Sequence, residues 1–148
     1  MKHMWSILCR RAIIDQSTQL VSLFEVIDAL PAPENAGEGL LAVEADFVTV
    51  WERDEEGRGE RHNARITVFD AKDIPLGTPL VQTINLESTP RVRATTRFPG
   101  FPIRGLGTHT LRLEVEKTED DSWETVVDYE VRVVSVTSLA QAAVQEGR

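Results

Sequence analysis

The sequence predicts an all-β protein: a two-sheet antiparallel immunoglobulin-like β-sandwich of about eight strands, with a short C-terminal helix or tail. Three observations lead to this fold class. Apolar and polar residues alternate with period two in several separate runs, polar or Gly/Pro-rich turns separate the runs, and no long amphipathic helix is evident before residue 137. Many short strands with such turns are typical of two packed antiparallel sheets.

Two N-terminal runs, WSILCRRAIID and LVSLFEVIDAL, are rich in branched apolar residues and are separated by QSTQ. Both runs have apolar residues on both faces, which is typical of central strands or of strands that carry bulges. The segment PAPENAGEG, residues 31–39, is expected to be a flexible connection.

The middle of the chain offers four further strand candidates. LLAVEADFVTVWE and ARITVFD alternate, and the polar RDEEGRGERHN between them is expected to be a hairpin loop. LVQTINL and RVRATTRF are shorter and are joined through ESTP, in which Pro90 interrupts the strand pattern. Trp51 falls on the apolar face of the first of these runs and is expected in the core.

The two clearest strands, THTLRLEVE and WETVVDYEVRVV, flank the acidic turn KTEDDS and predict a hairpin. In the second strand the residues from Trp123 to Val133 alternate, with Val126 as the exception, so Trp123 is also expected in the core. The last residues, SLAQAAVQEGR, have a helix-like composition. We therefore expect one domain over residues 1–136 and a tail or short helix over 137–148.

The stretch FPGFPIRGLGTHTLRLEVEK has two interpretations. A phosphate-binding glycine loop opens a helix, but this stretch opens a strand and lacks both G-x-G-x-x-G and a Gly-Lys-Ser/Thr ending. The sequence instead favours a structural corner, in which Gly105 and Gly107 take positive φ and His109 points inward with one ring nitrogen bonded to backbone.

The segments WSILCRRAIIDQSTQLVSLFEVID, FPIRGLGTHTLRLEV and DSWETVVDYEV together resemble a family of uncharacterised bacterial proteins, a domain of unknown function. The resemblance covers most of the chain, about residues 5–134, and its motifs belong to the scaffold. It implies a small bacterial β-sandwich protein and carries no activity with it. The sequence departs from the usual corner at His109, where a tyrosine would be more common.

Charge and cysteine content exclude some classes of function. The net charge of −8 argues against binding nucleic acid or an anionic membrane, both of which need a positive field. No apolar run approaches the roughly 18 residues of a membrane span. The single cysteine, Cys9, cannot form an internal disulfide and is expected to be a buried, inert thiol, so a cytoplasmic location is predicted.

The sequence contains no recognisable catalytic or zinc-binding set. Its three histidines, His3, His62 and His109, lack metal-site spacing, and no serine lies in a G-x-S-x-G elbow. We therefore expect no catalytic residue, no metal and no cofactor. One alternative stays open, since the acidic loops RDEEG and TEDDS also contain the oxygen ligands that Ca²⁺ prefers.

The distribution of arginines suggests a binding surface. Five arginines and no acidic residue lie between Ser88 and Leu113: Arg91, Arg93, Arg97, Arg104 and Arg112. They are expected either to pair across strands with Glu114, Glu116 or Glu130, or to form a site for an anionic partner.

The predicted function is therefore a non-enzymatic module that binds a protein partner or self-associates through a sheet face or edge. The alternative is a module for a small anionic ligand, and a hydrolase is the third hypothesis.

Overall fold

The computed structural model describes residues 1–54, 59–117 and 121–146, which form eleven strands and one helix, so the all-β class is confirmed. In chain order the elements are β1 (Lys2–Ile14), β2 (Val21–Val26), β3 (Ala29–Ala32), β4 (Glu38–Leu41), β5 (Ala45–Glu52), β6 (Arg61–Phe69), β7 (Pro75–Asn85), β8 (Arg91–Phe98), β9 (Phe101–Arg104), β10 (Gly107–Glu116), β11 (Trp123–Ser135) and α1 (Val136–Glu146).

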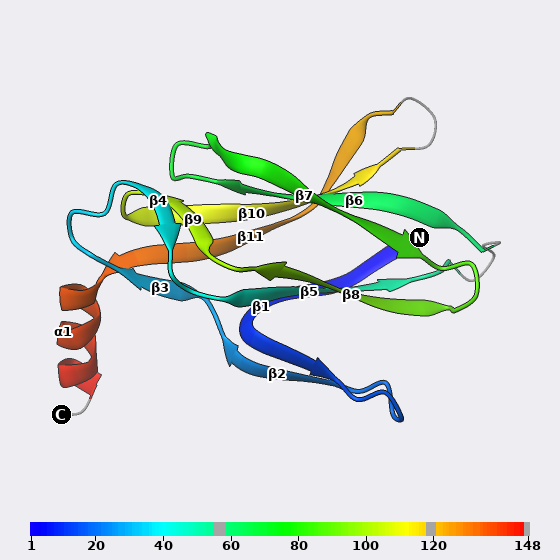
Figure 1. The fold of residues 1–148 in the computed structure, drawn as a ribbon, viewed down its shortest axis with the longest axis horizontal. Helices are drawn as coiled ribbons and strands as arrows, with labels where there is room; N and C mark the ends of the chain where they lie inside the picture. Colours follow the sequence, from blue (N-terminus) through cyan, green and yellow to red (C-terminus); the bar gives the residue numbers. More distant parts are fainter. Residues whose placement is uncertain (55–58, 118–120, 147–148) are drawn as a thin grey trace.

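Two main sheets form the body of the molecule (Figure 1). The first sheet has the strand order β2-β1-β5-β8, and the second has the order β3-β11-β10-β6-β7. β4 and β9 form a small third sheet of their own. The sequence analysis did not predict β3, β4 or β9, which are four residues each. β3 runs parallel to β11, so the expectation of purely antiparallel sheets is wrong at this pair.

The two main sheets share one hydrophobic core. Buried side chains that face this core come from both sheets: Leu8, Phe47 and Trp51 from the first, and Ile66, Leu111, Leu113, Val131 and Val133 from the second. The rings of Phe47 and Tyr129 meet edge to face across the two sheets, with centroids 5.8 Å apart. Burial of each such side chain contributes roughly 1.5–3 kcal/mol, so this shared core is the main source of stability.

Trp51 is confirmed as a core residue. Its side chain is 1% exposed, and its indole N–H donates to the Thr49 hydroxyl at 2.8 Å, so the only polar atom of the ring has a partner.

The expected hairpin of β10 and β11 is confirmed, but the expected position of Trp123 is wrong. Leu113 lies opposite Val127, whereas the next residue, Glu114, lies opposite Thr125, so Val126 is an inserted residue in β11. Such a bulge moves every residue before it to the other face of the strand. Trp123 consequently lies on the outer face, partly covered by the Arg65 guanidinium at 4.4 Å from its ring.

The hairpin that the sequence predicted around RDEEGRGERHN, residues 53–63, is wrong, because β5 and β6 belong to different sheets. β7 and β8 also belong to different sheets, and a hydrogen bond between side chains connects these two strands. The Thr96 hydroxyl donates to the Gln82 carbonyl at 3.0 Å, and the Gln82 amide donates to Thr49 at 3.4 Å.

The expected C-terminal helix is confirmed and begins at Val136, directly after β11. Ser135 caps it, since its hydroxyl accepts the backbone N–H of Ser138 at 3.2 Å. Within the described part of the chain, no helix has the length and apolar character needed to cross a membrane.

Candidate functional site

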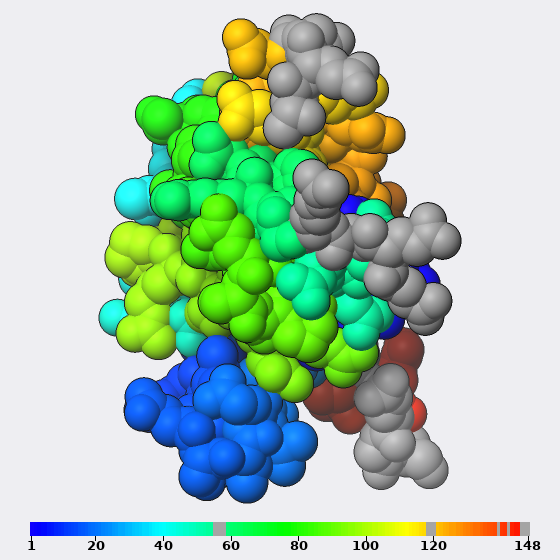
Figure 2. Space-filling view, turned by 90° about the vertical axis from the view of Figure 1, so that its right-hand side faces the viewer, coloured from blue at the N-terminus to red at the C-terminus, as the bar shows by residue number. Residues whose placement is uncertain are grey.

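A hairpin that leaves the body is the feature with the clearest capacity for binding. β1 pairs with β5 from Lys2 to Cys9 and with β2 from Cys9 to Ile14. Residues 10–14 of β1 therefore have β2 as their only neighbour among the strands that the structure describes. We call residues 10–26 the arm. It extends below the two sheets in Figure 1 and forms a lobe of its own, coloured blue, in Figure 2.

The buried carboxylate of Asp46, which is 1% exposed, holds the base of the arm. It accepts two hydrogen bonds from the Arg97 guanidinium, at 2.9 and 3.2 Å, and one from the backbone N–H of Ala12 at 2.9 Å. The Arg97 guanidinium and this N–H hold the pKa of Asp46 below its ordinary value. Asp46 thus satisfies a backbone donor of β1 at the point where that strand leaves β5.

Two further hydrogen bonds hold Ile27, the residue that follows the arm. The backbone N–H of Ile27 donates to the Leu8 carbonyl at 2.8 Å, and the Tyr129 hydroxyl donates to the Ile27 carbonyl at 3.0 Å. Cys9 is fully buried beside them, and burial raises the pKa of its thiol. A buried thiol with a raised pKa is a poor nucleophile, in agreement with the inert role expected for Cys9.

The arm exposes apolar side chains. Its exposed large apolar residues are Ile13, Ile14, Leu20, Phe24 and Val26. Phe24 lies opposite Arg11, and Ile14 lies opposite Val21, so the arm carries apolar residues on both faces. The sequence analysis left two interpretations of this pattern open, central strands or strands that carry bulges. The first is wrong for β2, which is the edge strand of its sheet. The second agrees with the register shift of β1 between His3 and Trp5 and with the positive φ of Glu25 in β2.

The tip of the arm is a tight turn. The Asp15 carboxylate accepts the backbone N–H groups of Ser17 and Thr18, at 2.8 and 2.9 Å, and the Ser17 hydroxyl at 2.6 Å. These hydrogen bonds, that of the Ser17 hydroxyl above all, lower the pKa of Asp15 to about 2. The exposed arm is therefore an ordered hairpin.

The edges of the two main sheets differ in how they are protected. β7 contains Pro75, Pro79 and a bulge at Gly77, whose φ is +70°. β3 is short and contains Pro31, and β8 carries three arginines. Prolines, bulges and charged side chains are the devices by which proteins keep sheet edges from pairing with other chains. β2, with the sequence VSLFEV, has no proline and a single charged residue, Glu25, whose φ of +54° interrupts the regular strand after Phe24.

The five arginines selected from the sequence do not converge on one site. Arg91, Arg93 and Arg97 alternate along β8, opposite Glu52, Val50 and Asp46 of β5. Arg91 binds Glu52 at 2.8 Å, whereas Arg93 makes no ion pair with the described residues. Arg104 lies in β9, and Arg112 lies in β10 of the other main sheet.

The acidic partners expected for these arginines are also wrong. Arg112 binds Asp128 at 2.9 Å and Asp73 at 3.3 Å, and it stacks on Phe69. Glu114 instead binds Arg65 through two bonds, at 2.7 and 3.1 Å.

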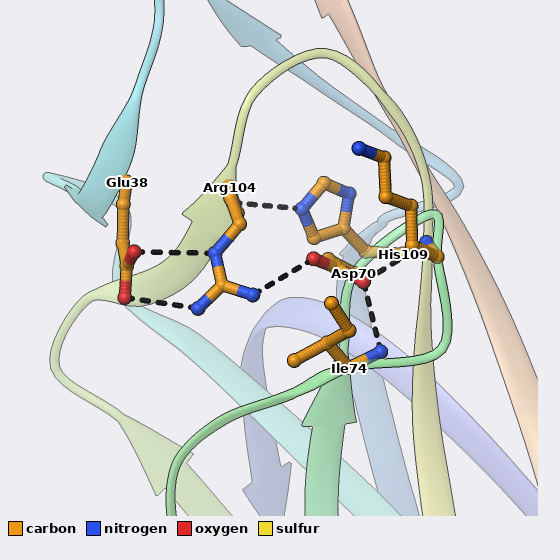
Figure 3. Close-up of polar contacts among 6 residues, drawn as sticks. Glu38, Asp70, Ile74, Arg104 and His109 are labelled. Atoms are coloured by element: carbon orange, nitrogen blue, oxygen red, sulfur yellow. Dashed lines mark hydrogen bonds and ion pairs between the residues drawn. The ribbon is translucent and has the colours of Figure 1, made fainter.

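The corner expected at Gly105, Gly107 and His109 has the predicted geometry (Figure 3). Gly105 and Gly107 have φ values of +76° and +120°, which favour glycine. The His109 ring is fully buried. Its Nε2 accepts the backbone N–H of Arg104 at 3.1 Å, so its Nδ1 carries the proton that it donates to the Gly107 carbonyl, also at 3.1 Å. Both ring nitrogens therefore bond to backbone, and neither is free to bind a metal.

Ion pairs complete the corner and leave little capacity for a ligand. Figure 3 shows the Arg104 guanidinium between Glu38 and Asp70, with bonds at 3.1 and 3.2 Å to Glu38 and 3.0 Å to Asp70. Asp70 also accepts the backbone N–H groups of Ile74 and Lys72, both at 2.9 Å, and these bonds together with Arg104 lower its pKa. Each of the three nitrogens of the Arg104 guanidinium thus donates one hydrogen bond within the chain.

Other candidate sites offer less. An apolar pocket of about 200 Å³ lies where the β7 bulge faces residues 98–102, and no charged residue lines it among those described. Among the described residues, no three His, Cys, Asp or Glu side chains are grouped so as to hold a metal ion. The proposed calcium loops contain residues 55–57 and 118–120, which lie outside the described residues.

Sequence reasoning selected the arginines and missed the arm, although the signal was present. Residues 12–24 contain one charged residue, Asp15, and apolar residues that fit both faces of a strand. Comparison of the chain with protein-family models and with curated proteins finds no match. The resemblance to an uncharacterised bacterial family therefore stays an expectation, and the function is inferred from the geometry of the chain.

Proposed function

We propose that this protein is a cytoplasmic, non-enzymatic interaction module, an immunoglobulin-like β-sandwich that binds a protein chain along the free edge of β2. The observation that carries the proposal is the combination of an unprotected edge with exposed apolar side chains at Phe24 and Val26, which are 50% and 59% exposed. An extended segment that adds to such an edge gains backbone hydrogen bonds from the edge and affinity from the side chains that flank it.

The two faces of the arm define the chemistry of the partner. Phe24 lies opposite Arg11 and Val26 lies opposite Cys9, while Val21 and Leu23 lie on the other face from Phe24. A strand added to β2 would cover both faces, so the best partner is an extended segment with apolar residues at consecutive positions. A strongly charged segment would leave buried charges without partners and is disfavoured.

The alternative of a small anionic ligand has weaker support. Arg91, Arg97, Arg104 and Arg112 each bind a carboxylate of the chain, and Arg93 is the one member of the set without an ion pair to the described residues. An anion would have to displace those carboxylates or bind one guanidinium in isolation, where an exposed ion pair contributes about 1 kcal/mol or less.

A pull-down from a lysate of the source organism tests the proposal. The bait proteins are the wild type, the double variant Phe24→Lys/Val26→Lys, and the control Val81→Lys. Val81 is matched to Val26 because it is a valine of an edge strand with a similar exposure, 64%. We expect a partner that is captured by the wild type and the control and lost by the double variant. Capture of the same proteins by all three baits, each with an unchanged circular dichroism spectrum, would contradict the proposal.

A further inference from the structure

We propose that the segment bound by the arm is the arm of a second copy of this chain, joined by antiparallel pairing of the two β2 strands about a two-fold axis. This inference rests on the proposed function and deepens it by naming the partner. It is argued from the shape of the arm, from its apolar faces and from the distribution of charge.

The geometry of the edge permits symmetric pairing. In a two-fold dimer the same surface serves both copies, so an edge strand meets its own image in antiparallel orientation. With the axis perpendicular to the sheet, each residue keeps its face, and the Phe24 side chains of the two copies lie together on one side. The four-stranded sheet β2-β1-β5-β8 then continues into that of the second copy. The arm extends from the body, so its free edge lies away from the other main sheet (Figure 1).

The apolar faces of the arm favour a second copy of the arm, rather than a surface strand of another protein, as the binding partner. β2 has apolar residues on both faces, and a complementary strand must therefore be apolar on both faces as well. A strand at the surface of a typical antiparallel sheet is polar on one face. The arm of a second copy has the required pattern, so each arm covers the other.

The arm carries no net charge, although the chain is acidic. The chain carries a net charge of −8, which opposes the close approach of two copies. Within the arm, Arg10 and Arg11 balance Asp15 and Glu25, and Arg10 binds Glu25 at 3.5 Å. The arm is thus a neutral, apolar surface on an acidic protein.

The energetics of small sheets point in the same direction. A hairpin of two strands that does not pack on a core is marginally stable in water, whereas three or more strands with an apolar face are stable. The arm has two strands, and all but three of its residues from 10 to 26 are exposed. Pairing with a second arm gives a four-stranded unit in which the exposed apolar side chains have neighbours.

Sedimentation equilibrium of the purified full-length chain tests the proposal, over a concentration series of wild type, Phe24→Lys, Val26→Lys and the control Val81→Lys. The wild type should be in reversible equilibrium between monomer and dimer. Each arm variant should raise the dimer dissociation constant at least tenfold, because the dimer brings two added lysines together on one face, and Val81→Lys should leave it unchanged.

Three outcomes would overturn the proposal. The first is a wild type that stays monomeric up to about 1 mM, the weakest association of interest. The second is a dimer that persists in both arm variants, and the third is a dimer that Val81→Lys weakens equally. If the wild type is monomeric but captures another protein in the pull-down that the arm variants do not capture, self-association is refuted and the proposed interaction function stands. If the wild type is monomeric and the arm variants capture the same proteins as the wild type, both self-association and the proposed interaction function are refuted.

Discussion

The arm and the corner are two regions of the same small protein, and they differ in how far their side chains have partners within the chain. At the corner the buried His109 ring bonds two backbone groups, and Arg104 joins Glu38 to Asp70, so its polar groups have partners within the chain. On the arm, by contrast, the side chain of Phe24 is 50% exposed and that of Val26 is 59% exposed. The polar groups of the corner bond within the chain, whereas the apolar side chains of the arm are exposed.

This difference shows how a scaffold can be separated from a binding surface when no catalytic group marks the site. Partnered polar groups and positive-φ glycines identify the corner as structural. Exposed apolar residues on an edge strand are the basis on which we propose that the arm binds another chain. On this view, substitutions in the body should change stability, and substitutions in the arm should change association.

The largest loss of stability is expected in the core. Trp51→Ala should lower the free energy of unfolding by about 3–5 kcal/mol, because the indole is fully enclosed between the sheets. Trp123→Ala should cost about 1 kcal/mol, because the bulge at Val126 places this indole on the outer face. Urea denaturation of both variants measures the difference. Equal losses would show that the assigned register of β11 is wrong.

His109→Ala should be the next most harmful change, with a loss of about 3 kcal/mol. The variant leaves the N–H of Arg104 and the carbonyl of Gly107 without partners and creates a cavity. Denaturation curves measure the loss, with Thr108→Ala at an exposed neighbouring position as the control. A stoichiometric metal that is present in the wild type and lost in His109→Ala would instead make His109 a ligand.

Asp46→Asn should cost about 2 kcal/mol, because it weakens the charged bonds to Arg97 and the bond to the N–H of Ala12. The same carboxylate predicts a pH dependence. Its folded pKa is below its unfolded value, so its contribution is present above the unfolded pKa of about 3.9 and is lost as the pH falls through the folded pKa. Denaturation at neutral and acidic pH should show that Asp46→Asn loses less stability on acidification than the wild type does. An equal loss of stability would show that Asp46 does not contribute to the pH dependence.

The smallest effect is expected at Arg93. Arg93→Glu should change stability by less than about 0.5 kcal/mol, because Arg93 makes no ion pair with the described residues. Arg97→Glu should be clearly more harmful, since it brings a second carboxylate to the buried Asp46. Thermal melts of the two single variants distinguish them, and similar melting temperatures would argue against Asp46 as the anchor of the arm.

The sequence predicted the features that depend on local periodicity. Alternation located β10 and β11, and the glycines of the corner have the expected positive φ values. The inserted residue Val126 reversed the face of Trp123, since one added residue outweighs the pattern of the whole strand. The partners of Arg97 and Arg112 also could not be predicted, because they depend on which strands become neighbours.

The arm shows the same limit in another form. Apolar residues on both faces are typical of a strand in the middle of a sheet, of a strand with a bulge or of a surface that contacts another chain. The sequence pattern does not distinguish these cases. The topology excludes the first for β2, because it places β2 at an edge and ends the pairing of β1 with β5 at Cys9.

Amide hydrogen exchange of the unmodified protein at low and high concentration tests the central claim most directly. The amides of β2 are to be compared with those of β7, an edge strand with two prolines and a bulge. The account predicts that exchange in β2 slows as the concentration rises, while exchange in β7 stays the same, because pairing protects the free edge of the arm alone. Exchange in β2 that is independent of concentration, or equal slowing in β7, would contradict it.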